Sequence, residues 1–567
     1  MMRRVVLTKG DSFANVQPAR RRIGGIVGAA EHASVLERMH QVLGPHAQLI
    51  ATGLTREPDL RPQITFDSDV CTLEGRSVNT VDEWRRALPL LSRVTGAFAL
   101  AWSPEPGLLY LARDRVGHRT LYYASSGSAF VFASSIRALL ATGLVARTLD
   151  ERALLKFLTY AYVPGKRTLI EGVSELLPGE VLRAQGSNVA IVDSFAATSA
   201  SASQEPSDEL ALTTDLTRAL DTVVSAYASS PMPLSATLSG GIDSSLVVAL
   251  AALRGSLHTH SITFGAPHKD ELEWSGLVAA HCGTDHTIVE IPAQTILAHF
   301  DDTMAWLDKP NGDPLTVPNA LLFREASKTG THVLNGEGGD PCFGGPKNLP
   351  MLLASLYGEG DDDEPNALPR SYLRSHLKCF DDLGEMVDGD LAARARQKPL
   401  EDDILPWLAD DSRDLVGQLM ALNVRFKGGH HILPKVDALS LPFGVTPRSP
   451  LFSDTLVDLA SKLAPEWKLR GSVEKYLLKR SVTHLLPDAI INRPKSGMMV
   501  PVEAWFQGPM LAFAKERVLD GLAPRGLFRR EFLERLLLGR QLGLRPRRGV
   551  KLWLLVTLES HLRQLGL

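Results

Sequence analysis

The sequence predicts a strand-rich first domain followed by an α/β domain whose C-terminal part is helical. Short apolar runs separated by turn residues, at 94–102, 108–112 and 129–133, indicate strands in the first domain. After residue 210, apolar strands alternate with helices, which predicts a parallel sheet with helices on its faces. From about residue 366 onward, helical patterns dominate.

A change of composition separates the two domains. The residues after 195 are small and polar and include a proline, which is typical of a linker. We therefore divide the chain into an N-terminal extension (1–22), a first domain (23–195), a linker (196–209) and a second domain (210–567). Within the second domain, the acidic segment 358–365 is expected to be a mobile loop.

The overall composition excludes several classes of protein. The chain has 567 residues and a formal net charge of -3, so it has no strong field to attract nucleic acid or an anionic membrane. Its four cysteines show no CxxC spacing, which argues against a zinc site and favours a reducing compartment. The N-terminal apolar stretch stops after Leu7, and no window approaches the ~20 apolar residues of a membrane helix. We expect a cytoplasmic protein with no nucleic-acid or membrane partner.

The clearest functional pattern is the run 239–245, SGGIDSS, between an apolar strand and an apolar helix. Its glycines let the backbone approach an anion, and the following helix offers free N–H groups to phosphate. The Asp243 carboxylate would repel phosphate but suits magnesium, which bridges phosphate and carboxylate. The run lacks the lysine of a Walker A loop. It is similar to the loop of pyrophosphate-releasing ATPases that transfer AMP. The predicted ATP-binding residues here are Leu238, Ser239, Gly240, Gly241, Asp243, Ser244 and Ser245.

A second pattern, 333–340, begins like a strand and ends in a glycine-rich loop with two acids. Because parallel sheets bind ligands at the carboxyl ends of their strands, this loop is expected to face the phosphate loop. Asp340 would then be a second magnesium ligand, and Glu337 would lie near the reacting carbonyl. A third pattern is NRPKSG at 492–497, where Lys495 could stabilise departing pyrophosphate. An acidic glycine turn and a surface lysine are the ordinary alternatives.

These three motifs, in this order, resemble the asparagine synthetase superfamily over nearly the whole chain. The resemblance implies a glutaminase-like first domain, an α+β sandwich of the Ntn type, and a second domain of the α/β pyrophosphate-loop ATPase type. It implies ATP and Mg2+ as cofactors and catalytic roles for Glu337 and Lys495. It also places ATP contacts at Ile262, Asn335 and Gly336. Residues 437–454 resemble the segment that closes the synthetase domain.

The first domain departs from the glutaminase pattern at its essential residues. Residues 23–28, IGGIVG, match the family's opening pattern, but Gly24 replaces the cysteine nucleophile. That cysteine must be the first residue, so that its own amine can act as the base. Leu43 stands in place of the arginine that holds the glutamine carboxylate, and 74–76 reads EGR in place of Asn-Gly-Glu. We predict that this domain does not hydrolyse glutamine and supplies no ammonia.

The amine must then arrive with a substrate. The run 338–348 resembles lasso-peptide cyclases, macrolactam synthetases of antibiotic biosynthesis. That resemblance implies adenylation of an Asp or Glu side chain in a precursor peptide, followed by attack of the peptide α-amine. It also implies a leader-peptide-binding protein and a cysteine-protease-like protein as partners. The helical region 366–430 would form one wall of a peptide groove. An ammonia-dependent asparagine synthetase, a β-lactam synthetase and an inactive scaffold remain as alternatives.

Overall fold

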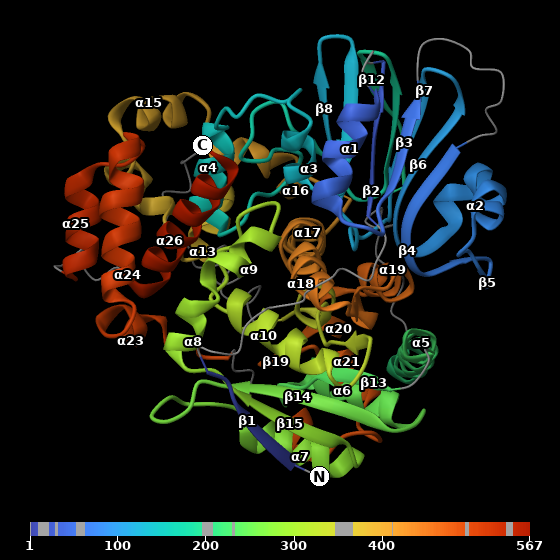
Figure 1. Ribbon diagram of the computed structural model, residues 1–567. Coiled ribbons are helices and arrows are strands. Elements are labelled where there is room, and N and C mark those ends of the chain that lie inside the picture. Colours follow the sequence, from blue (N-terminus) through green and yellow to red (C-terminus); the bar gives the residue numbers. More distant parts are fainter. Residues whose placement is uncertain are drawn as a thin grey trace.

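The computed structural model places two domains against each other (Figure 1). No helix in the part of the chain that it describes is both long and apolar enough to cross a bilayer. The structure describes residues 2–8, 22–28, 32–52, 63–195, 208–229, 233–345, 367–410, 412–493, 498–539 and 548–567.

The first domain is a sandwich of two sheets, as predicted. One sheet has the order β10-β8-β9-β2-β3, and the other has the order β12-β11-β7-β6-β4-β5. Apolar side chains from both sheets, including Ile23, Leu111 and Phe132, form a buried cluster between them. The strands are β2 (Ile23–Val27), β3 (Gln48–Thr52), β4 (Gln63–Leu73), β5 (Arg76–Ser77), β6 (Val94–Glu105), β7 (Leu108–Arg113), β8 (Tyr122–Ser126), β9 (Ala129–Ala133), β10 (Ser174–Glu175), β11 (Glu180–Gln185) and β12 (Asn188–Ser194).

Helices of the first domain begin and end at residues suited to those positions. The Asp150 side chain accepts from the backbone N–H of Ala153 and caps α4, satisfying one of the free donors of its first turn. Helix α4 ends where Ala161 adopts a left-handed conformation with φ 70°, which is uncommon for a residue with a side chain. The helices are α1 (His32–Leu43), α2 (Val81–Ala87), α3 (Ile136–Ala141) and α4 (Glu151–Tyr160).

The second domain contains the predicted parallel sheet, in the order β1-β15-β14-β13-β16-β17. Apolar runs form its central strands, and the intervening segments form the helices that alternate with them. The strands are β13 (Leu234–Thr237), β14 (Leu257–Thr263), β15 (Asp285–Glu290), β16 (His332–Leu334) and β17 (Thr446–Arg448), and the helices of this region are α5 (Glu209–Ala228), α6 (Ile242–Ala252), α7 (Leu272–Cys282), α8 (Ala293–Ala298), α9 (Phe300–Trp306), α10 (Thr316–Ser327) and α11 (Gly339–Phe343).

Strand β1 (Met2–Val6) belongs to the sheet of the second domain, although the first domain follows it in sequence (Figure 1). It runs parallel to β15, and the backbone N–H of Leu7 donates to the carbonyl of Glu290 at 2.9 Å. This part of the N-terminal extension therefore forms an edge strand of the second domain's sheet. The sequence MRRVV did not indicate this, because a five-residue strand with two arginines has no clear apolar pattern.

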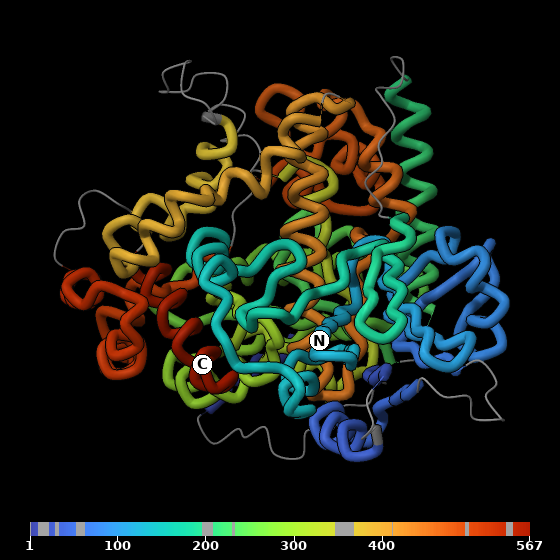
Figure 2. The backbone as a smooth tube through the Cα atoms, turned by 90° about the horizontal axis from the view of Figure 1, so that it is seen from above, coloured from blue at the N-terminus to red at the C-terminus, as the bar shows by residue number. Residues whose placement is uncertain are grey.

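Helices dominate after residue 366, as predicted. Helix α17 (Leu415–Leu422), the π-helical η4 (Asn423–Ile432) and α18 (Leu433–Ser440) run without interruption between the first domain and the sheet (Figure 1). From above, the C-terminal helices lie on the side away from the blue strands of the first domain (Figure 2). The other helices are α13 (Ala367–Ser375), α14 (Leu383–Met386), α15 (Gly389–Gln397), α16 (Leu405–Leu408), α19 (Asp454–Lys462), α20 (Pro465–Lys468), α21 (Tyr476–Ser481), α22 (Asp488–Ile491), α23 (Val502–Gln507), α24 (Leu511–Lys515), α25 (Arg530–Leu538) and α26 (Arg548–Leu565), and the hairpin β18 (Leu469–Arg470) and β19 (Val473–Glu474) precedes α21.

Candidate active site

Hydrogen bonds within the chain fix the shape of the loop between β13 and α6. The backbone N–H of Ser239 donates to Ser244 Oγ at 3.1 Å, and that of Gly241 donates to Ser239 Oγ at 3.3 Å. Gly240 has φ 76°, a left-handed conformation that glycine adopts at little cost. The loop leads directly into the eleven-residue helix α6, whose first N–H groups and dipole favour an anion. This geometry fits the predicted phosphate site.

The glycine-rich loop after β16 lies directly against the phosphate loop. A Cβ added at Gly336 would lie 2.4 Å from the Ser244 nitrogen, and one added at Gly339 would lie 2.1 Å from Asp243 Oδ1. Contacts that short do not occur, so only glycine permits this approach. The two loops therefore converge at the carboxyl ends of β13 and β16, as the strand pattern predicts.

A cavity of about 450 Å³ opens over these loops. Its size is typical of a small-molecule site. Ser245 does not line it, since its side chain is fully buried within α6. Gly240 packs against Trp274 and Ser275 and does not line it either. The predicted site residues that do line it are Leu238, Ser239, Gly241, Asp243, Ser244, Ile262, Asn335, Gly336, Glu337 and Asp340.

Several of the sequence predictions fall outside the described residues, among them most of the predicted linker, residues 196–207. Lys495 is one of them, so its predicted role in pyrophosphate departure stays a prediction. The acidic segment 358–365 and the last three residues of the run 338–348 also lie there.

Lys475 joins the two predicted metal ligands, and sequence reasoning missed it. Its Nζ lies 2.5 Å from Asp243 Oδ2 and 2.5 Å from Asp340 Oδ1. Burial would lower the pKa of Lys475, but the two carboxylates outweigh burial and raise it above its ordinary value. Because it stands next to an ordinary helical pattern, EKYLLK, no local signal distinguishes it from a surface lysine.

The two carboxylates fit a magnesium ion that is shared with phosphate. Both point at one position, where the Lys475 ammonium contacts an oxygen of each. Carboxylate oxygens are the ligands magnesium prefers, and it usually takes one or two of them together with phosphate oxygens and water. In the described ranges, no group of three or more His, Cys, Asp or Glu is arranged to hold a metal. Phosphate would have to complete the site.

Glu337 occupies the junction between the phosphate end of the cavity and its other half. Burial raises the pKa of this half-buried carboxyl, while the nearby lysines Lys435 and Lys427 oppose the rise. Its backbone N–H donates to Asn335 Oδ1 at 3.1 Å, which fixes the loop. A carboxyl with a raised pKa is suited to proton transfer near neutral pH.

The other half of the cavity is lined by rings and lysines from three segments. The end of α4 contributes Tyr160 and Tyr162, and the Tyr162 ring stacks on His431 at 4.8 Å between centroids. One face of η4 lines the cavity with Asn423, Lys427 and His431, which are spaced four residues apart. Helix α13 and the residues after it contribute Tyr372, Ser375, His376 and Lys378. The region 366–430 thus forms one wall, and the first domain forms another.

The position where the resemblance would put a glutaminase nucleophile is tightly packed. Gly24 lies inside strand β2, and a Cβ built there would be 3.1 Å from Leu43 Cδ1 and 3.3 Å from Leu49 Cδ2. Leu43, which replaces the predicted glutamine-binding arginine, is 2% exposed and part of the core. Apolar leucine side chains therefore occupy the space beside the Gly24 backbone.

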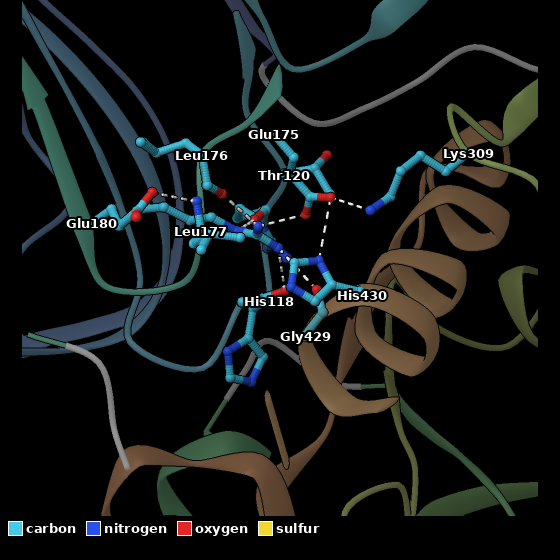
Figure 3. Close-up of polar contacts among 12 residues, drawn as sticks. His118, Thr120, Glu175, Leu176, Leu177, Glu180, Lys309, Gly429 and His430 are labelled. Carbon is cyan, nitrogen blue, oxygen red and sulfur yellow. Dashed lines mark hydrogen bonds and ion pairs between the residues drawn. The ribbon is translucent and has the colours of Figure 1, made fainter. Parts of the chain in front are cut away.

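Buried ion pairs join the two domains. Glu175 of the first domain contacts Lys309 and His430 of the second, and Arg113 donates to it at 2.6 Å (Figure 3). Burial opposes its ionisation, but Lys309, His430 and Arg113 together hold the pKa of Glu175 below its ordinary value. A cavity of about 40 Å³ lies beside this cluster and is lined in part by Lys309 and His430.

The segment 437–454 makes further contacts with the first domain. Arg119 pairs with Asp437 at 2.9 Å, and Arg448 makes a bidentate pair with Asp69 at 2.8 and 2.9 Å. The Gly96 N–H donates to Asp454 Oδ2 at 2.8 Å. The segment that resembles a closing element of the synthetase domain therefore also contacts the first domain.

Comparison with known proteins is consistent with this two-domain arrangement. Residues 215–563 match the asparagine synthase family, and residues 78–195 match the glutamine amidotransferase domain. Asparagine synthetase [glutamine-hydrolyzing] 1 of Bacillus subtilis is 26% identical over 455 residues, which is 74% of this chain and 70% of that protein. A putative asparagine synthetase [glutamine-hydrolyzing] of Mycobacterium tuberculosis is 27% identical over 464 residues, 75% of this chain and 70% of that protein. Amidase chry2 of Gibberella zeae is 21% identical over 494 residues, covering 75% and 72%.

Proposed function

The chain belongs to the asparagine synthase family, whose members are ATP-using, AMP-forming carbon–nitrogen ligases, and from that premise we propose that it closes a macrolactam ring in a precursor peptide. The donor is an Asp or Glu side-chain carboxylate of the peptide, and the acceptor is the α-amine of the same chain. The observation that carries the proposal is the closed glutamine site, where Leu43 packs beside Gly24.

The source of the amine is the first step of the argument. A glutamine-dependent ligase needs an open nucleophile site and a route for ammonia between its domains. Here the nucleophile position is packed with apolar side chains, and the contact around Glu175 is a buried ion cluster. The amine therefore arrives with a substrate, through the large cavity.

The chemistry follows from the order of groups along the cavity. The substrate carboxylate oxygen bonds to the α-phosphorus of ATP, and pyrophosphate leaves from the loop at the start of α6. The amine nitrogen then bonds to the acyl carbon, AMP leaves, and the amine loses one proton. Glu337, which lies between the phosphate loop and the ring-lined half, is the residue we assign to that proton. Bound magnesium would neutralise charge on the phosphates, held by Asp243 and Asp340.

The ring-lined half of the cavity supports a peptide substrate. Tyrosine and histidine rings offer broad contact area to a peptide at low entropic cost, and lysines beside them can hold a carboxylate. Holding both ends of one peptide together lowers the barrier by roughly 7–11 kcal/mol, because the reaction becomes unimolecular. A leader-peptide-binding protein and a cysteine-protease-like protein are proposed partners, since the α-amine must first be freed.

Mass spectrometry tests the proposal. The full chain is incubated with ATP, magnesium and a leader-free core peptide with Asp or Glu near position eight, as the family resemblance suggests. We expect the peptide to lose one water as AMP forms in equal amount. A matched peptide with Asn or Gln at that position serves as the control and should give neither product. AMP formation only with free aspartate plus ammonia would replace the proposal with an asparagine synthetase activity.

A further inference from the structure

The ammonium group of Lys475 occupies the point where the two predicted metal ligands meet. It lies 2.5 Å from an oxygen of Asp243 and 2.5 Å from an oxygen of Asp340, so those two oxygens are at most about 5 Å apart. The three groups come from separate segments, at the start of α6, in α11 and just before α21. Only 2% of the Lys475 side chain is exposed.

The backbone at Lys475 is a second and independent observation. Its φ of 55° and ψ of 38° place it in the left-handed region, which long side chains rarely adopt. Such strained residues persist only where the surrounding structure holds them, and they concentrate at functional sites. The unfavourable backbone conformation at Lys475 therefore accompanies the position of its ammonium group between the two carboxylates.

We propose that Lys475 is a resident cation that closes the metal position until nucleotide arrives, so that the divalent ion enters only together with ATP. The inference rests on the ATP- and metal-binding part of the proposed function, and it does not depend on the peptide. A free ion would have to expel a lysine that both carboxylates already neutralise. It would gain only two protein ligands, because among the described residues no third His, Cys, Asp or Glu joins them.

Nucleotide changes this balance in two ways. Its phosphates bring further oxygen ligands to the ion, and they give the displaced ammonium a new anionic partner. No charge is left without a partner in the exchange, since the ammonium moves from the carboxylates to the phosphates while the divalent ion takes its place between the carboxylates. The expected behaviour is strong coupling between metal and nucleotide binding, with little metal bound when nucleotide is absent.

Electron paramagnetic resonance of free Mn2+, with the nucleotide-free full chain, tests the proposal. The wild type should bind Mn2+ weakly, and Lys475→Met should bind it at least ~10-fold more tightly, a size typical of coupled ligands. Lys479→Met, the same change of charge one helical turn away, should bind like the wild type. The double variant Lys475→Met with Asp340→Asn should lose the new site. Unchanged affinity in Lys475→Met would overturn the proposal.

A thermal-shift measurement on the wild type does not depend on the variants folding. Mn2+ together with a non-hydrolysable ATP analogue should raise Tm, and Mn2+ alone should leave it unchanged. An equal rise with Mn2+ alone would show an open metal site and would overturn the inference. If the peptide assay fails while these results hold, only the macrolactam proposal is lost.

Discussion

Gly339→Ala should inactivate the enzyme without unfolding it, because the added methyl group meets a metal ligand. Its Cβ would lie 2.1 Å from Asp243 Oδ1 and 2.2 Å from Asp243 Cγ. Ordinary contact begins at 3.4 Å, so the carboxylate or the loop must retreat by about 1.3 Å. The backbone itself accepts alanine, since Gly339 is not in the left-handed region.

A displacement of about 1 Å from the productive geometry can cost ~10²-fold in rate. We therefore expect AMP formation to fall about 100-fold in kcat/KM, equivalent to roughly 2.7 kcal/mol of transition-state stabilisation. Calorimetric binding of magnesium with a non-hydrolysable ATP analogue should weaken as well. The control is Gly384→Ala in α14, where an added Cβ has no neighbour within 4 Å. Near-normal AMP formation by Gly339→Ala would refute the argument that the close packing of the two loops positions the metal ligands.

The remaining predictions concern single groups. Asp243→Ala and Asp340→Ala should each abolish magnesium-dependent AMP formation while circular dichroism shows an intact fold. Gly24→Cys should release no glutamate from glutamine above a no-enzyme control, since the added side chain points at packed leucines. Lys495→Ala should lower kcat by ~10²–10³ with a smaller change in KM for ATP, and the opposite pattern would reassign it to ground-state binding. Burial raises the pKa of Asp454 to about 6, so the protonated form stabilises the fold below about pH 4, and this stability is lost as pH rises through 6. In urea unfolding, the free energy of unfolding of the wild type, relative to that of Asp454→Asn, should fall by about 2 kcal/mol from pH 4 to pH 7, and a difference independent of pH would contradict the shift.

The sequence predicted those parts of the site that follow from local rules. Strand, glycine loop and helix are consecutive at 234–252, so the phosphate loop could be located from spacing alone. The meeting of this loop with 335–340 follows from a general property of parallel sheets. Both predictions needed only the period of the apolar residues and the positions of glycines.

Contacts between distant segments have no such pattern in the sequence. Lys475 lies 232 residues from Asp243, and nothing near it marks it as buried. Strand β1 pairs with β15 across the whole first domain and the beginning of the second, and parallel pairing over that separation has no local signature. The ring-lined half of the cavity is also built from three separate segments. Sequence reasoning indicated the region 366–430 as a wall but could not name its residues.

Buried ion pairs join the second domain to the first. Arg448 is 7% exposed and pairs with Asp69, while Asp437 pairs with Arg119. Removing one partner of a buried pair typically costs 3–5 kcal/mol, because the other charge is left without compensation. The first domain is therefore a structural part of the ligase, and it also supplies the Tyr162 ring to the large cavity.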